Sequence, residues 1–136
     1  ALVIQALRAA GECRRAPLVQ AGLDYLRSTQ NADGGFGFTP DAESDANSTA
    51  YVIQALLAAD QDPAGAYWSM AGKSPIDALR DLQLTDGSFE WIAGSGSNPI
   101  ATQQAIPALL RTPLVAADDQ AACSELYLPV ITNGVE

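Results

Sequence analysis

The 136-residue sequence contains no histidine, and this absence excludes several kinds of active site. Without histidine the chain can form neither a Ser-His-Asp triad nor a Cys-His pair, and it offers no imidazole to a metal ion. Its two cysteines, Cys13 and Cys123, are too few and too far apart in the sequence for a zinc cluster. Either they form one disulfide in an exported protein, or they remain two buried thiols.

Basic residues are also scarce. Lys and Arg number 7 against 16 Asp and Glu, so the formal net charge is −9, and Arg14 and Arg15 are the one adjacent basic pair. Because nucleic-acid binding needs clustered positive charge to neutralise phosphates, we expect no nucleic-acid partner. All apolar runs are shorter than the roughly 20 residues that cross a bilayer, so we also expect no membrane insertion.

The sequence begins directly on an amphipathic helical pattern, ALVIQALRAAGE. No N-cap residue and no signal-peptide pattern precedes it. We interpret this start as a cut, made by processing or by trimming of a longer chain.

Several segments of the sequence occur twice, at regular intervals. VIQALRAAGE at Val3–Glu12 returns as VIQALLAADQ at Val52–Gln61, 49 residues later. LDYLRSTQNADGGFGF at Leu23–Phe38 returns as IDALRDLQLTDGSFEW at Ile76–Trp91, 53 residues later, and STAYVIQALL returns as ATQQAIPALL at the same shift. Matches that alternate in a fixed order predict a repeat unit of about fifty residues, made of helix, connector, helix and Gly-aromatic turn.

Two kinds of helix alternate along the chain. One kind is apolar on nearly every face, as around Val52 and Ile53, which is typical of a helix packed on more than one side. The other carries a single apolar stripe, as at Val19 and Leu23. We expect the first kind at 1–10, 47–59 and 100–111, and the second at 16–29 and 74–84. This alternation predicts an all-α fold of two layers, in which Pro107 should kink or break the last helix.

The Gly-aromatic turn, QNADGGFGF, keeps four residue types in its second copy, QLTDGSFEW. The retained residues are Gln30, Asp33, Gly34 and Phe36 in the first copy, and Gln83, Asp86, Gly87 and Phe89 in the second. A phosphate-binding loop has no reason to recur after each striped helix, so we predict a structural turn. The glycines reverse the chain, the glutamines bond to neighbouring backbone, and the aromatic residues, Phe38 and Trp91 included, wedge between helices.

The motif Q-x-x-D-G-G-F after a striped helix, alternating with S-T-A-x-x-I-Q-A-L-L-A-A, resembles the prenyltransferase and squalene-cyclase repeat. The resemblance covers residues 1–114 and implies an α/α toroid, in which two concentric rings of helices surround a cavity. A closed toroid of this family needs about twice the helices predicted here. We therefore expect 1–114 to be the C-terminal part of a longer toroid, partnered by its remaining N-terminal repeats or by a second copy. Residues 115–136 depart from the pattern, and ELYLPVI predicts an irregular or strand-like tail.

The catalytic groups of that family are not matched. Its protein prenyltransferases use a zinc site of Asp, Cys and His, and this chain has no histidine. Its squalene-type cyclases protonate their substrate with an Asp of a D-x-D-D motif, whereas the most similar stretch here is DAESD, at Asp41–Asp45. We predict a solvated acidic loop or a helix cap at this stretch, with a weak calcium site as the alternative. We therefore assign no catalytic residue and no metal, and we lean towards a chain without catalysis of its own.

The resemblance also implies a candidate binding surface, because the N-termini of inner helices surround one mouth of a toroid's cavity. The residues at these positions are Asp45, Asn47, Ser48, Thr49, Asn98, Thr102, Gln103 and Gln104. Amides and hydroxyls beside helix N-termini suit a small polar ligand that is uncharged or anionic. The alternative is structural: Asn47 or Ser48, and Asn98, cap helices, and the glutamines satisfy backbone groups.

Three functions follow from the resemblance. Two stretches, SDANSTAYVIQALLAA and the segment from LQLTDGSFEW to NPIATQQAIPALL, are similar to non-catalytic surface proteins of bacteria. Our first interpretation is therefore a repeat domain of a secreted or cell-surface protein, serving ligand binding or assembly. The alternatives are a fragment of a terpene-cyclase or prenyltransferase-like enzyme whose catalytic residues lie outside this chain, and a cobalamin-carrier-like domain. Cobalamin is the one cofactor considered. A Tyr-Leu-Pro tail similar to those of some exported proteins favours an extracellular location.

Overall fold

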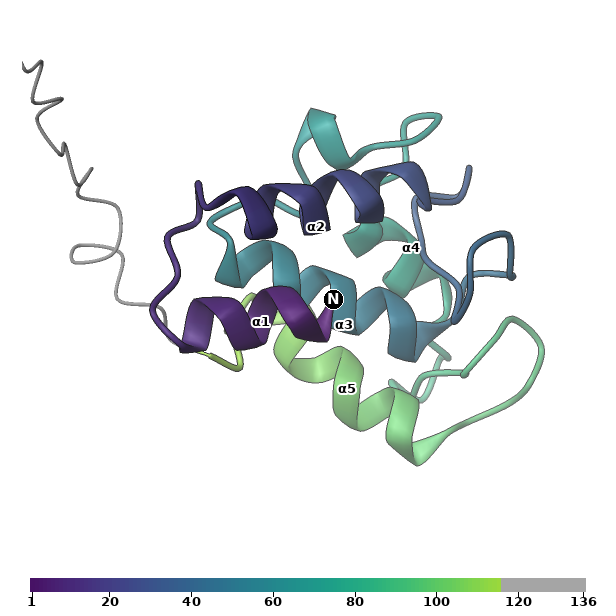
Figure 1. The fold of residues 1–136 in the computed structure, drawn as a ribbon. Helices are drawn as coiled ribbons and strands as arrows, with labels where there is room; N and C mark the ends of the chain where they lie inside the picture. Colours follow the sequence, from purple (N-terminus) through teal and green to yellow (C-terminus); the bar gives the residue numbers. More distant parts are fainter. Residues whose placement is uncertain (116–136) are drawn as a thin grey trace, which may run out of the picture.

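The computed structural model describes residues 1–115, and this part of the chain is all-α, as predicted (Figure 1). Its helices are α1 (Leu2–Ala9), α2 (Pro17–Ser28), α3 (Ala46–Ala58), a 3-10 helix, η1 (Ala66–Trp68), α4 (Pro75–Asp81) and α5 (Pro99–Leu109). No β-sheet forms within these residues, where paired backbone outside the helices is limited to isolated bridges. The expected strand-like tail lies outside the described residues, apart from its first residue.

Side-chain caps define where three of the helices begin. Asp45 caps α3 by accepting a hydrogen bond from the Ser48 N–H at 2.7 Å. Ser74 opens α4 in a capping box with Asp77, and Asn98 opens α5. The cap predicted at Asn47 or Ser48 was therefore wrong, because the helix begins at Ala46 and the Asp45 carboxylate satisfies a free N–H group of its first turn.

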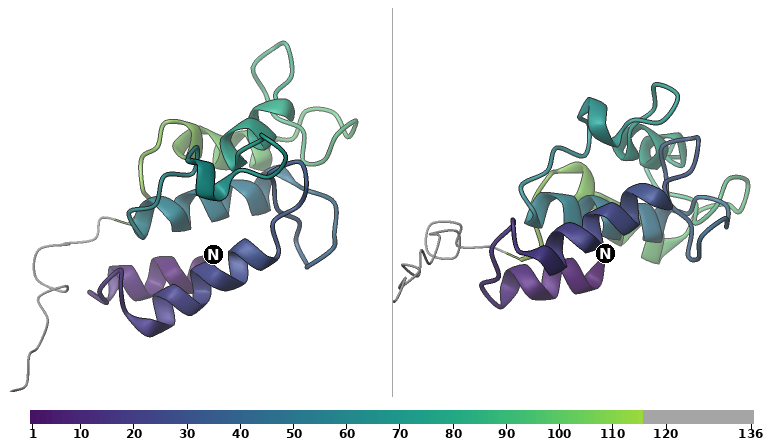
Figure 2. Two further views of the ribbon diagram at one scale, coloured as in Figure 1. Left: turned by 90° about the horizontal axis from the view of Figure 1, so that it is seen from above. Right: turned by 45° about the horizontal axis from the view of Figure 1, so that its top comes forward.

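Helix α3 is the centre of the fold. It contacts α1, α4 and α5, and α1 also contacts α2. Seen from above, α1 and α2 lie on one side of α3, and α4 and α5 lie on the other (Figure 2, left). In Figure 1, α2 and α4 lie above α3, whereas α1 and α5 lie on its lower side. The helices predicted to be apolar on nearly every face, α1, α3 and α5, thus form one row, and the striped helices α2 and α4 pack against that row.

The core consists of two clusters on opposite sides of α3. The first joins α1, α2 and α3, and its members are Ile4, Val19, Leu23, Leu26, Phe36, Val52, Ala55, Leu56, Ala59 and Trp68. The second joins α3, α4 and α5, and its members are Ala46, Ala50, Ile53, Ile76, Leu79, Leu82, Phe89, Ala101, Ala105 and Ala108. Since burial of one large apolar side chain contributes about 1.5–3 kcal/mol, each cluster is a substantial part of the stability.

Three sequence-based expectations differ from the structure. Pro107 does not break α5, which continues to Leu109, because its missing N–H removes a single backbone hydrogen bond of the helix. Helix α4 ends at Asp81 and not at the expected residue 84, because the chain leaves the helix and turns back so that Gln83 pairs with Phe89. Phe38 is 86% exposed and wedges between no helices, because the loop beyond Phe36 turns away from the core.

Candidate functional site

The two Gly-aromatic turns have the same backbone-bonding glutamine. Gln30 donates from Nε2 to the carbonyl of Gly34 at 2.8 Å, and also to the carbonyl of Trp68 at 2.7 Å. In the second copy Gln83 donates to the carbonyl of Gly87 at 3.2 Å. Gln30 is buried whereas Gln83 is exposed, so the first turn is held inside the fold and the second lies on its surface.

The aspartate of each turn accepts the N–H of the residue two positions later. Asp33 accepts from Gly35, and Asp86 accepts from Ser88, both at 2.9 Å. The Ser88 hydroxyl also donates to Asp86 at 2.7 Å, and these bonds from Ser88 lower the pKa of the Asp86 carboxyl. Such Asx turns fix the chain reversal with local bonds alone.

A threonine of the following helix closes each turn. The N–H of Phe36 donates to Oγ1 of Thr49 at 3.1 Å, and the N–H of Phe89 donates to Oγ1 of Thr102 at 2.9 Å. Thr49 is fully buried. Two of the residues expected to bind a ligand, Thr49 and Thr102, therefore use their hydroxyls to tie a helix to the preceding turn.

The other residues of that predicted surface are distributed over several environments. Asp45 and Asn98 are the caps of α3 and α5, and Asp45 also lines a pocket together with Phe38 and Trp91. Asn47 leaves its buried Oδ1 without a hydrogen-bond partner among the described residues. Ser48 lines a pocket beside α1, whereas Gln103 and Gln104 line a second pocket beside α5. The structure does not bring the eight residues together in one pocket, and no comparison tests their role as ligands.

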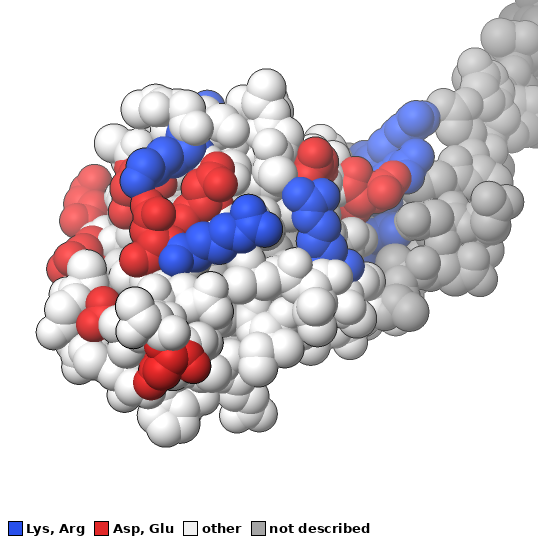
Figure 3. Space-filling model, turned by 180° about the vertical axis from the view of Figure 1, so that it is seen from behind, with Lys and Arg blue, Asp and Glu red and all other residues white. Residues whose placement is uncertain are grey.

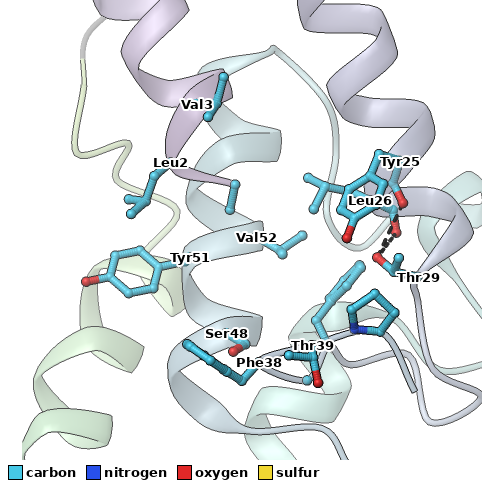
Figure 4. Close-up of a pocket in the computed structure, with 14 residues that line it drawn as sticks. Leu2, Val3, Tyr25, Leu26, Thr29, Phe38, Thr39, Ser48, Tyr51 and Val52 are labelled. Atoms are coloured by element: carbon cyan, nitrogen blue, oxygen red, sulfur yellow. Dashed lines mark hydrogen bonds between the residues drawn. The ribbon is translucent and has the colours of Figure 1, made fainter. Parts of the chain in front are cut away.

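The pocket beside α1, which we name the α1–α3 pocket, has a volume of about 360 Å³. Its wall comes from α1, α2, α3 and the loop after Phe36 (Figure 4). The lining residues are Ala1, Leu2, Val3, Tyr25, Leu26, Thr29, Phe36, Gly37, Phe38, Thr39, Pro40, Ser48, Tyr51 and Val52. Most of these side chains are apolar or aromatic. The hydroxyl of Thr29 donates a hydrogen bond to the backbone of α2 (Figure 4), so it is not available to a ligand.

No charged side chain lines the α1–α3 pocket. The wall offers hydroxyls at Ser48, Tyr25 and Tyr51 but no carboxylate that could transfer a proton. The pocket is therefore suited to hold an apolar group and not to protonate it.

Sequence reasoning missed the aromatic part of this pocket. Tyr25 and Tyr51 are the signals that could have found it, because each places an aromatic ring on a helix; Tyr25 is exposed and Tyr51 is half-buried. Phe38 was expected to wedge between helices, and the structure places it at the pocket wall instead.

The charged side chains of residues 1–115 form no further candidate site. On the face drawn in Figure 3, Lys and Arg side chains are interleaved with Asp and Glu and form no separate basic patch. Lys73 and Asp81, for example, form an exposed ion pair at 2.5 Å, and this bond raises the pKa of Lys73. Within residues 1–115 no group of three His, Cys, Asp or Glu side chains is arranged to hold a metal ion.

Comparison with known proteins relates the chain to one enzyme. It is 34% identical over 104 residues to drimenyl diphosphate synthase of Streptantibioticus cattleyicolor. The match covers 74% of this chain but 19% of the relative, so the chain corresponds to about a fifth of the relative's length. This distant, partial homology supports a relation to the terpenoid-cyclase-like superfamily and nothing narrower.

The other comparisons add no relative. No family model matches the chain. No solved structure matches it either.

The predictions about a disulfide and about membrane insertion can be compared with the structure only within residues 1–115. Cys123 lies outside the described residues, so its disulfide with Cys13 stays a prediction. None of the helices within residues 1–115 is long and apolar enough to span a membrane.

Proposed function

We propose that this chain is a segment of a terpenoid-cyclase-like protein and that it forms part of the wall of an apolar substrate cavity. The observation that carries the proposal is the 34% identity over 104 residues to drimenyl diphosphate synthase. The similarity favours the enzyme alternative over the non-catalytic surface protein of our first interpretation. The catalytic groups are then expected outside this chain, since it contains no D-x-D-D motif.

The α1–α3 pocket supports this proposal by its chemistry. An apolar wall such as Leu26, Phe36 and Val52 favours a hydrocarbon chain by about 0.8 kcal/mol for each buried CH₂ group. If a cyclase of this superfamily protonates its hydrocarbon substrate, a positive charge develops in a cavity that excludes water. The rings of Tyr25 and Tyr51 would stabilise such a charge through their electron-rich faces.

The exposed apolar faces of the two end helices support the idea of a longer array. Leu2 and Val3 of α1 are 62% and 71% exposed, and Ile100 and Ile106 of α5 are 58% and 51% exposed. In a repeat array the faces of end helices are covered by the next repeat. We propose that residues 1–114 are an arc of an α/α toroid and that neighbouring repeats of the same protein cover these faces.

The proposal is tested by incubating the full-length protein with linear isoprenoid diphosphates and analysing the products by gas chromatography and mass spectrometry. Thr39 lines the pocket from an exposed loop, so Thr39→Trp fills the cavity without changing the core. We expect this variant to lose most of its turnover or to change its product. Thr85→Trp, on the exposed loop of the second turn, is the matched control and should behave like the unchanged protein.

Each other outcome separates the alternatives. If the full-length protein forms no cyclised product from any of these diphosphates, the proposal is wrong, and a binding or assembly role is the remaining reading. A change in the absorbance of cobalamin on titration with the protein would favour the carrier-like alternative.

A further inference from the structure

A second pocket lies between α3 and α5, and it is lined by three glutamine side chains and by one aromatic residue, Tyr51. This α3–α5 pocket has a volume of about 290 Å³. Its polar groups are the amides of Gln54, Gln103 and Gln104 and the hydroxyl of Tyr51, and Pro107 and Leu114 contribute apolar surface. No charged side chain lines it.

Gln54 is the group in this pocket that needs explanation. It is 2% exposed, and its Oε1 accepts a hydrogen bond from the N–H of Leu114 at 2.8 Å. Because only the oxygen of an amide can accept this bond, the orientation of the side chain is settled, and Nε2 is the free end. Nε2 is buried and has no hydrogen-bond partner among the described residues. A buried donor that is left without a partner costs about 1–3 kcal/mol.

Gln104 presents a second unused group to the same pocket. Its Nε2 donates to the hydroxyl of Tyr51 at 3.1 Å, and its buried Oε1 has no partner among the described residues. The Tyr51 hydroxyl can donate as well as accept, so the amide of Gln104 can also bind in the reverse orientation. In either orientation one of its two polar atoms is left unpaired.

The related position on α1 behaves differently. Gln5 occupies the place in VIQAL that Gln54 occupies 49 residues later, and its Nε2 donates to the carbonyl of Tyr51 at 3.3 Å. An inter-helix hydrogen bond thus satisfies the glutamine between α1 and α3. Between α3 and α5 the corresponding donor is left facing a pocket.

We propose that the α3–α5 pocket binds a small neutral molecule whose polar group both accepts and donates a hydrogen bond, as a carboxamide or an alcohol does. Its oxygen accepts from Nε2 of Gln54, its hydrogen-bond donor meets Oε1 of Gln104, and its apolar part lies against Pro107 and Leu114. A charged ligand is disfavoured, because no opposite charge lines the pocket to offset the loss of its hydration. This inference does not depend on the proposed function.

The test uses fluorine NMR of three aromatic probes of similar size with the full-length protein. The probes are para-fluorobenzamide, para-fluorobenzoate and para-fluorotoluene. We expect saturable binding of the amide, and binding of the carboxylate and of the hydrocarbon that is weaker by about tenfold or more. Equal binding of the hydrocarbon would overturn the proposal in favour of an apolar cleft. Absence of binding by the amide would overturn it in favour of a pocket that holds water only.

Two variants locate the binding and distinguish it from a structural role of Gln54. Gln54→Glu keeps the oxygen that accepts from Leu114 but replaces the free donor, so it should lose the preference for the amide. Gln104→Met keeps the length of the side chain and removes its polar atoms, so it should weaken amide binding by about tenfold if one hydrogen bond is lost. Gln20→Met on the exposed surface of α2 is the control and should leave binding unchanged. Unaltered binding of the amide by both pocket variants would contradict the assignment.

Discussion

At the scale of single residues, the buried hydroxyl of Thr49 links a turn to the helix that follows. It accepts the N–H of Phe36 at 3.1 Å and donates to the carbonyl of the same residue at 3.3 Å. We expect Thr49→Val to lower the free energy of unfolding by about 1–3 kcal/mol, because the substitution leaves the buried N–H unpaired. Urea denaturation measures the change. Thr102→Val, at a less buried site, should cost less, and an equal or larger loss there would contradict this account.

The glycines Gly34 and Gly87 form a matched pair at the same place in the two turns. Both have positive φ, at 84° and 87°. A Cβ at Gly34 would lie 2.4 Å from the carbonyl oxygen of Lys73, whereas a Cβ at Gly87 would meet nothing within 4 Å. We expect Gly87→Ala to cost about 1 kcal/mol from the backbone conformation alone, and Gly34→Ala to cost about 2–4 kcal/mol. Thermal denaturation of both variants checks this, and equal losses would refute the packing argument.

The roles of individual residues could be predicted from the sequence only where the pattern was local. The Q-x-x-D-G turn was predictable, since Gln30 and Asp33 bond to backbone within a few positions. The hydroxyl of Thr49 was assigned to a ligand because a threonine near a helix N-terminus looks the same in either role. Its partner, the N–H of Phe36, is 13 residues away and becomes visible only in three dimensions.

At the scale of helices, the capping box of α4 makes stability depend on pH. The hydroxyl and the N–H of Ser74 both donate to the Asp77 carboxylate, and these bonds lower the pKa of Asp77. A carboxyl with a lower pKa in the folded state stabilises the fold above its unfolded pKa, and this contribution is lost as the pH falls through the folded value. The difference in unfolding free energy between the unchanged protein and Asp77→Asn should therefore be largest near neutral pH and shrink below about pH 4.

Denaturation of both proteins across this pH range is the measurement. A difference that stays constant down to the acidic end would show that the cap does not depend on the charge of Asp77.

Helix positions were predictable to within a few residues because apolar periodicity and caps agree. The predicted start of α4 at residue 74 lies within one residue of the observed start at Pro75, which Ser74 caps. The end of α4 was not predictable, since it depends on the pairing of Gln83 with Phe89 across the turn. Pro107 was expected to kink or break the last helix, but α5 continues past it to Leu109, because one missing N–H does not end a helix whose other residues still pack.

At the scale of the whole molecule, the exposed apolar face of α1 should behave as an interface. Val3 is 71% exposed in this chain, so Val3→Asp should change the stability of the 136-residue chain by less than about 0.5 kcal/mol. In the full-length protein, where neighbouring repeats are proposed to cover this face, it should cost about 2 kcal/mol or more. Leu18→Asp on α2 is 67% exposed in this chain and should be nearly neutral in both settings. Equal effects of Val3→Asp in both settings would contradict the proposed packing.

For the molecule as a whole, only the fold class could be predicted from the sequence. Alternation of apolar and striped helices correctly indicated an all-α fold, because burial on one or several sides leaves a periodic mark. The eight polar residues expected at one cavity mouth are instead divided among caps, turns and two pockets. Their positions could not be predicted, because hydrogen bonds between side chains of different helices produce no periodic pattern in the sequence. The secreted location and the ligand remain predictions.

The most direct test of the central claim is a crystal structure of the full-length protein with an unreactive analogue of an isoprenoid diphosphate. We expect the hydrocarbon part to lie within about 4 Å of the α1–α3 pocket wall, at Tyr25, Phe38 and Val52. A hydrocarbon chain bound elsewhere, with this pocket filled by side chains of neighbouring helices, would contradict the claim that this segment lines the substrate cavity.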